Sequence, residues 1–156
     1  MGLFNFKSKK SVVVSPASGE ILPITSCEDK VFSEKMMGDG FLIKPESGEF
    51  FSPVTGKVSM VFETKHAIAF TTNDGFEVLV HIGMDTVKLN GEGFEVLVNS
   101  GDKVKAGQKI CNVDLSLIES KGYLTHTPVV ITNLDGKEIS LIKTGKCDKG
   151  EEIIEL

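Results

Sequence analysis

Arginine is absent from the sequence, so all 17 basic side chains among the 156 residues are lysines. The guanidinium group binds a phosphate or a carboxylate through two parallel hydrogen bonds, and a site built on arginine is therefore excluded. Any phosphate must be held by histidine, lysine, hydroxyl groups or the backbone. With 22 acidic residues the formal net charge is −5, the wrong sign for nucleic-acid binding, and we expect no nucleic-acid partner.

Cysteines and long apolar runs are also scarce. Cys27, Cys111 and Cys147 lie far apart and form no C-x-x-C pair, which argues against a disulfide framework and against a thiolate zinc site. No apolar run reaches the roughly 18 residues of a membrane-spanning helix, and the N-terminus lacks the core and cleavage site of a signal peptide. We therefore predict a soluble protein of the reducing cytoplasm.

The length suits one compact domain, which we place at residues 12–156 after a flexible tail of residues 1–11. The first ten residues combine Leu3, Phe4 and Phe6 with three lysines, a composition that suits at most weak contact with an anionic membrane surface. This stretch is too short for a stable isolated helix. It also has Phe6 where a myristoylation signal has Ser or Thr.

Short apolar stretches with alternating polarity dominate the rest of the chain, and Gly, Pro, Asn and Asp separate them. Only residues 114–120 and 31–36 suit short helices. We therefore predict an all-β fold, an antiparallel sandwich or partly closed barrel with short helical turns. The predicted strands are residues 11–14, 19–24, 40–43, 56–62, 67–71, 76–82, 94–98, 109–113, 127–131 and 139–143.

Three turns favour the sandwich-barrel architecture. Residues 15–21 and 52–58 repeat a Ser-Pro-x-x-Gly pattern typical of a proline-initiated turn that leads into a strand. Residues 100–108 read G-D-x-V-x-x-G-Q after the first serine, as in biotinyl and lipoyl carrier domains. A swinging-arm carrier is therefore one alternative function, but Lys65 is expected in mid-strand rather than at the hairpin tip that such a domain requires.

Two histidines flank a predicted hairpin whose loop contains Asn73, Asp74 and Gly75. If the loop is Asn73-Asp74, His66 lies opposite His81; if it is Asp74-Gly75, His66 lies opposite Gly83 and diagonal to His81. In both registers the two imidazoles share one face of the sheet. That face would carry Phe62, Thr64, His66, Ile68, Glu77, Leu79 and His81, whereas Val61, Ala67, Val78, Val80 and Ile82 would point the other way.

Facing imidazoles admit three chemical interpretations. They are two structural histidines, or two ligands of a metal site to which Asp85 is the only plausible addition, or a phosphoryl-accepting nucleophile with a hydrogen-bond donor beside it. The third interpretation needs an acceptor on the other nitrogen of the nucleophile, and the backbone around Gly83 can provide it. His126 has no such companion, and we interpret it as structural or surface-exposed.

Together, five segments resemble the glucose-type enzyme IIA family of the bacterial phosphoenolpyruvate-dependent sugar phosphotransferase system. The resemblance runs from about residue 12 to the C-terminus. The segments are residues 31–40 (VFSEKMMGDG), 62–67 (FETKHA), 80–87 (VHIGMDTV), 91–94 (GEGF) and 127–130 (TPVV).

The resemblance implies an antiparallel β-sandwich that accepts a phosphoryl group from the phosphocarrier protein HPr and passes it to the IIB domain of a sugar permease. It implies that His81 is phosphorylated on Nε2, that His66 stabilises the phosphoryl oxygens and that Thr64 orients His66. It further implies that the Gly83 carbonyl binds the other nitrogen of His81, and that Asp29 and Asp85 meet basic residues of the partners.

The resemblance also implies an apolar recognition surface around the histidines and a monomer without a resident cofactor. Zinc would bind His66 and His81 only in a complex whose partner adds a carboxylate. A further alternative is a regulatory protein whose choice of binding partner changes when His81 is phosphorylated. The expected partner-binding residues are Asp29, Val31, Phe32, Met36, Met37, Phe62, Leu79 and Val87.

Overall fold

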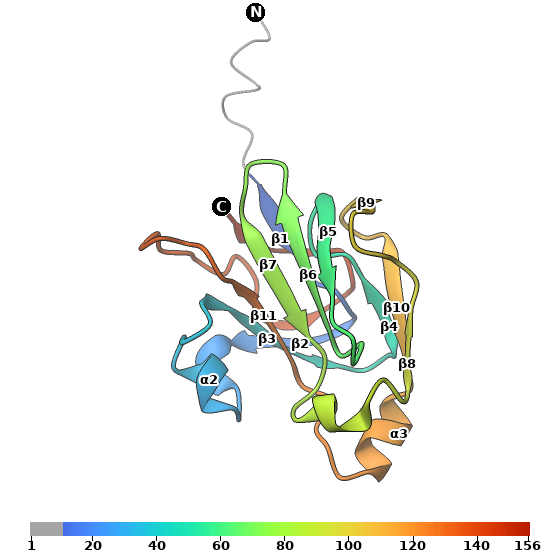
Figure 1. Cartoon of the computed structure of the whole chain (residues 1–156). Coiled ribbons are helices and arrows are strands. Elements are labelled where there is room, and N and C mark those ends of the chain that lie inside the picture. The colour runs from blue at the N-terminus through green and yellow to red at the C-terminus, as the bar shows by residue number, and fades with distance from the viewer. Residues whose placement is uncertain (1–10) are drawn as a thin grey trace, which may run out of the picture.

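The computed structural model describes residues 11–156, so the predictions made for the tail at residues 1–10 lie outside it. Within this part, strands and turns dominate and the helices are short (Figure 1). The elements are β1 (Val12–Val14), β2 (Gly19–Pro23), η1 (Ile24–Ser26), α2 (Lys30–Ser33), β3 (Asp39–Pro45), β4 (Glu49–Phe51), β5 (Gly56–Val61), β6 (Ala67–Thr72), β7 (Glu77–His81), η2 (Thr86–Leu89), β8 (Phe94–Val96), β9 (Lys103–Val104), β10 (Lys109–Val113), α3 (Leu115–Ser120), β11 (Thr127–Ile131), β12 (Gly145–Cys147) and β13 (Glu152–Glu155).

The strands form antiparallel sheets, as the alternating pattern predicts. The largest sheet has the order β12-β2-β3-β11-β7-β6-β5-β9, and smaller sheets have the orders β4-β10-β8 and β1-β13. No closed barrel forms among the described strands. The mainly β fold class is confirmed, and no helix within residues 11–156 is long and apolar enough to cross a membrane.

The strand predictions fail mainly at the edges of the sheets. Residues 139–143 were predicted as a strand but make only one isolated bridge, between Leu141 and Ile154. The short strands β4, β9, β12 and β13 were missed because two to four residues are too few to show alternation. Their pairing depends on strands that are distant in the sequence.

The centre of the large sheet buries both of its faces. On β3, Phe41 and Ile43 belong to the main core, whereas Leu42 between them packs into a second apolar cluster on the opposite face. On β7, Val80 faces the main core and Leu79 the second cluster. The second cluster also contains Ile24, Cys27, Phe32, Ala67, Met84 and Val130, so it anchors η1 and α2 against the sheet.

The β6–β7 hairpin adopts neither of the two predicted registers. Its loop has three residues, because the Thr72 hydroxyl donates to the Asp74 carboxylate at 2.6 Å and accepts from the Phe76 amide at 2.9 Å. Ala67 therefore lies opposite His81. The predicted division of faces is wrong at two positions: Ile68 joins Val78, Val80 and Ile82 in the main core, and Ala67 joins Leu79 in the second cluster.

Candidate functional site

His66 and His81 meet although the predicted register was wrong. Their ring centroids lie 4.8 Å apart and the ring planes are nearly perpendicular, at 85°. His81 ends β7, whereas His66 immediately precedes β6 and follows the turn of residues 62–65, in which Lys65 has a left-handed backbone (φ 65°). Because of this turn, His66 does not continue the alternating side-chain pattern of β6, and its ring points towards His81.

The same turn contradicts the mid-strand placement of Lys65. Lys65 lies exposed in the connection between β5 and β6, at the tip of that hairpin. Its amide donates to the Phe62 carbonyl at 2.8 Å, which closes the turn. The position of Lys65 at a hairpin tip is therefore compatible with a carrier domain and does not exclude that alternative.

Each imidazole has a hydrogen-bonding partner at Nδ1. The Gly83 carbonyl oxygen lies 2.9 Å from His81 Nδ1, and the Thr64 hydroxyl oxygen lies 2.7 Å from His66 Nδ1. A carbonyl oxygen only accepts, so His81 carries its proton on Nδ1 and leaves the Nε2 lone pair free. The Thr64 hydroxyl orients the second ring.

The loop after β7 holds the Gly83 carbonyl in place. Gly83 has φ +81°, and a side chain there would lie 2.5 Å from Thr86 Cγ2 and 2.9 Å from the Leu124 carbonyl oxygen. The Thr86 hydroxyl donates to the Ile82 carbonyl at 2.5 Å. Only glycine satisfies both the backbone conformation and this close packing.

Burial keeps both histidines neutral at pH 7. The His66 side chain is almost completely buried, and this burial, together with the neighbouring His81, lowers the pKa of His66 to about 4. Burial also lowers the pKa of His81, against the opposing effects of the Gly83 carbonyl and the charges of Asp29 and Asp85. The free Nε2 lone pair of His81 is therefore available as a nucleophile.

Aromatic rings close the sides of the pair. Phe32 packs against His81 with ring centroids 5.1 Å apart, and Phe62 packs edge-on against His66 at 5.8 Å. Phe32 is buried and Phe62 is half-buried. These rings reduce the exposure of the imidazoles to water, which strengthens polar interactions made there.

The apolar residues predicted to form the recognition surface around the histidines are partly exposed and partly buried. Met36 is 69% exposed, Val87 46%, and Val31 and Met37 39% each. Leu79 and Phe32 are buried in the second apolar cluster and support the site through its packing. The exposed side chains and the half-buried Phe62 offer apolar surface to a partner.

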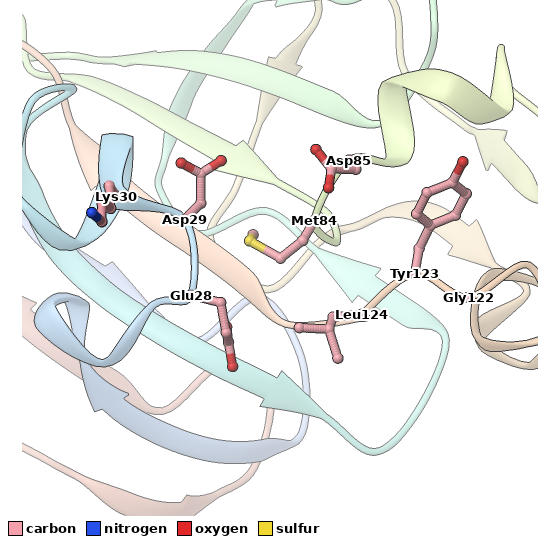
Figure 2. A pocket seen from close by; sticks show the side chains of 8 residues that line it. All are labelled: Glu28, Asp29, Lys30, Met84, Asp85, Gly122, Tyr123 and Leu124. Atoms are coloured by element: carbon pink, nitrogen blue, oxygen red, sulfur yellow. The ribbon is translucent and has the colours of Figure 1, made fainter.

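An acidic hollow of about 530 Å³ lies beside His81, between the loop before α2 and the loop after β7. In Figure 2, Asp29 and Asp85 lie above Met84, and Glu28 and Leu124 lie below it. Asp29 also caps α2, because its carboxylate accepts the Val31 amide at 2.9 Å. The lining residues are Glu28, Asp29, Lys30, Met84, Asp85, Gly122, Tyr123 and Leu124.

The sequence interpretation missed Glu28, which pairs with His126. His126 Nδ1 lies 2.8 Å from the Glu28 carboxylate, and this contact lowers the pKa of Glu28. His126 is half-buried, and its partner Glu28 lies 98 residues away in the sequence. Nothing local in the sequence signals such a pair.

Within residues 11–156, no three His, Cys, Asp or Glu side chains are placed to hold a metal ion together. His66 and His81 alone supply two nitrogen ligands, fewer than the three protein ligands of a catalytic zinc site. Asp85, the third ligand considered from the sequence, lines the hollow beside the pair and does not complete such a group.

Comparison with known proteins assigns the chain. Residues 11–136 match the family model described as phosphoenolpyruvate-dependent sugar phosphotransferase system, EIIA 1. The chain belongs to this EIIA family. It is a glucose-type EIIA phosphocarrier of the phosphotransferase system, and the biotinyl or lipoyl carrier alternative is set aside.

Some relatives of this EIIA phosphocarrier match over nearly their whole length, and others are much longer proteins. The glucose-specific EIIA component of Oceanobacillus iheyensis is 45% identical, with 97% of this chain and 94% of the relative aligned. The solved structure of the glucose permease IIA from Mycoplasma capricolum superimposes with a TM-score of 0.90 at 41% identity, covering 96% of this chain and 97% of that one. The chain spans about a fifth (21%) of the glucoside-specific EIICBA component of Staphylococcus carnosus, to which it is 47% identical.

Proposed function

We propose that His81 accepts the phosphoryl group from phosphorylated HPr and passes it to the IIB domain of a glucose-type sugar permease. Membership of the EIIA family implies HPr and IIB as the partners. The observation that carries the choice of residue is the 2.9 Å contact between His81 Nδ1 and the Gly83 carbonyl. It leaves Nε2 as the one nitrogen of His81 with a free lone pair, on a ring that faces His66.

The transfer is a displacement at phosphorus. The Nε2 lone pair of His81 forms a new N–P bond while the N–P bond of the donor histidine breaks, and that electron pair returns to the donor nitrogen. The second transfer repeats the displacement with His81 Nε2 as the leaving nitrogen. Because no proton has to leave His81 during the attack, a neutral ring with a proton on Nδ1 is the reactive form.

His66 stabilises the transferred group by donating a hydrogen bond from Nε2 to a phosphoryl oxygen. This role requires the His66 proton on Nε2, and in that tautomer Nδ1 accepts a hydrogen bond from the Thr64 hydroxyl, whose oxygen lies 2.7 Å away. The half-buried Phe62 and buried Phe32 keep the surroundings dry, so this hydrogen bond is stronger than it would be in water.

Partner recognition combines the exposed apolar side chains with the acidic hollow. Val31, Met36, Met37 and Val87 offer an adaptable apolar surface, and methionine adapts to partners of different shape at little cost. Asp29 and Asp85 attract basic residues of the partner, among which arginines would supply the guanidinium group that this chain lacks. Lys30, next to Asp29, adds a positive charge at this rim.

We further propose that the chain works as a monomeric, cytoplasmic protein with one EIIA domain at residues 12–156. Within residues 11–156 the antiparallel sheets and the main core extend from β1 to β13, and the second apolar cluster packs on the opposite face of the same large sheet. The proposed site needs only residues of one chain.

The test is phosphorylation by phosphoenolpyruvate, enzyme I and HPr, followed by mapping of acid-labile, base-stable phosphate by mass spectrometry. We expect one phosphate, on His81, and none in His81→Gln. His66→Gln should still be phosphorylated on His81 but should fail to pass the group to IIB. Phosphate on His66 or His126, or normal onward transfer by a correctly folded His66→Gln, would contradict the assigned roles.

A further inference from the structure

A second hollow, of about 420 Å³, lies at the opposite end of the β5–β6 hairpin from the histidines. His66 follows β5 at one end of this hairpin, whereas Gly56 begins β5 and Asn73 follows β6 at the other. The six-residue strands separate the two places by about 20 Å. In Figure 1 this end carries β9 and the β6–β7 turn, far from α2 and α3. The lining residues are Thr55, Gly56, Lys57, Asn73, Lys103, Val104, Lys105 and Gln108.

Three lysines converge on this hollow from two distant segments. Lys57 on β5 lies directly opposite Lys103 on β9. Lys105 follows two residues later and lines the same hollow. Like charges directly opposite one another in a sheet destabilise the pairing. Within the part of the chain that the structure describes, none of the three forms an ion pair, although the chain carries an excess of acidic residues.

Two further polar side chains of the hollow, Thr55 and Gln108, can donate a hydrogen bond to a ligand. The Thr55 hydroxyl oxygen accepts the Ala106 amide at 3.1 Å, and the Gln108 carbonyl oxygen accepts the Lys105 amide at 3.1 Å. These contacts do not use the Thr55 O–H or the Gln108 NH₂ group, so both can donate to a ligand. No carboxylate lines the hollow.

The carboxylates adjacent in sequence are already engaged. Asp74 accepts hydrogen bonds from the hydroxyls of Ser11 and Thr72, each at 2.6 Å, which contribute to lowering its pKa. Asp102 accepts the Asn99 amide at 2.8 Å. Neither of these hydrogen bonds involves a lysine of the hollow, so the positive charge there is left without a hydrogen-bonded counterion.

We propose that this hollow, which we name the lysine pocket, binds the phosphate group of a small organic phosphate. A doubly charged phosphate would bridge Lys57, Lys103 and Lys105 and relieve their mutual repulsion. The buried Val104 and the aliphatic stems of the lysines offer an apolar floor for the organic part of the ligand. The volume is in the range that small molecules occupy.

This inference is independent of the proposed phosphorylation of His81, because the two sites share no residue. A ligand of the lysine pocket would therefore bind equally well to the protein and to its His81→Gln variant.

The test uses inorganic phosphate and glycerol 3-phosphate as probes, added at constant ionic strength with chloride as the reference. Backbone amide shifts in NMR spectra should change mainly at residues 55–57, 73 and 103–108, and glycerol 3-phosphate should bind more tightly than inorganic phosphate. The double variant Lys103→Gln/Lys105→Gln should lose at least tenfold in affinity. Without ligand, its unfolding temperature should be higher than that of the parent chain, because the repulsion is gone.

The matched control removes two exposed lysines elsewhere, Lys44→Gln/Lys146→Gln, and so changes the net charge equally. We expect it to bind both probes as the parent chain does. Equal losses in both double variants, shifts centred on the histidines, or the same shifts with chloride alone would overturn the proposal. Binding to phosphatidylglycerol vesicles without binding to either soluble phosphate would also overturn it, in favour of a lipid headgroup.

Discussion

Lowering the pH from 7.5 to 5 should destabilise this EIIA protein mainly through His66. In the unfolded chain the imidazole has a pKa near 6.5, whereas burial and the neighbouring His81 lower it to about 4 in the folded protein. Between these values the unfolded chain binds a proton that the folded protein does not. The stabilising contribution of the neutral ring is therefore complete above pH 6.5 and is lost as the pH falls towards 4.

The magnitude follows from the same two values. Each pH unit in this window costs about 1.4 kcal/mol of unfolding free energy, so His66 should account for about 2 kcal/mol at pH 5. His81, whose pKa is lowered as well, adds to the loss in the same direction. The pKa values of Glu28 and Asp74 lie below those of ordinary carboxyls. Their contributions to the unfolding free energy are therefore lost mainly at a lower pH than that of His66.

The assay is urea unfolding followed by far-ultraviolet circular dichroism, at pH 7.5, 6.5, 5.5 and 5 and constant ionic strength. The comparison is between the parent chain and His66→Gln, whose side chain does not titrate. The loss of unfolding free energy between pH 7.5 and 5 should be smaller by about 2 kcal/mol in the variant. An equal loss in both proteins, or an NMR titration that places the pKa of His66 at 6.5 or above, would refute the reasoning.

Three further predictions concern the site. Thr64→Val should leave uptake of phosphate on His81 nearly intact but slow onward transfer about tenfold, since one hydrogen bond that orients His66 is lost; single-turnover transfer measures this, and Thr64→Ser should restore it. Gly83→Ala should cost about 2 to 5 kcal/mol of unfolding free energy, from the left-handed backbone and the contact with Thr86, and a loss below 1 kcal/mol in urea unfolding would contradict the packing described. Met36→Gln should change stability by no more than about 0.5 kcal/mol but should reduce the second-order rate of phosphorylation by HPr about fivefold, and an unchanged rate would remove Met36 from the partner surface.

Much of the candidate site was predicted because its residues fall in short sequence motifs that resemble the EIIA family. His81, Gly83 and Asp85 fall within one five-residue segment, and Thr64 and His66 within another. Contacts over two residues, such as Thr64 with His66, depend on one turn alone. The hairpin register was not predictable, because Asn-Asp-Gly suits loops of two or three residues and the Thr72 hydroxyl decides between them.

Pairs that are distant in the sequence could not be predicted. Glu28 and His126 are 98 residues apart, and neither has a neighbour that signals the other. Lys57 and Lys103 face each other only because the two-residue strand β9 pairs with the start of β5. The burial of Phe32 likewise depends on the second apolar cluster, which forms from six or more separate segments.

The sequence by itself determined the all-β class and most of the central strands, because alternation and turns are local properties of the chain. Its short motifs, through their resemblance to the EIIA family, also indicated the candidate site residues. Only the tertiary structure decided which strands pair at the edges, how the His66 ring turns towards His81 and where the three lysines converge. These outcomes depend on side-chain packing between segments far apart in the sequence, and such packing is a property of the folded whole.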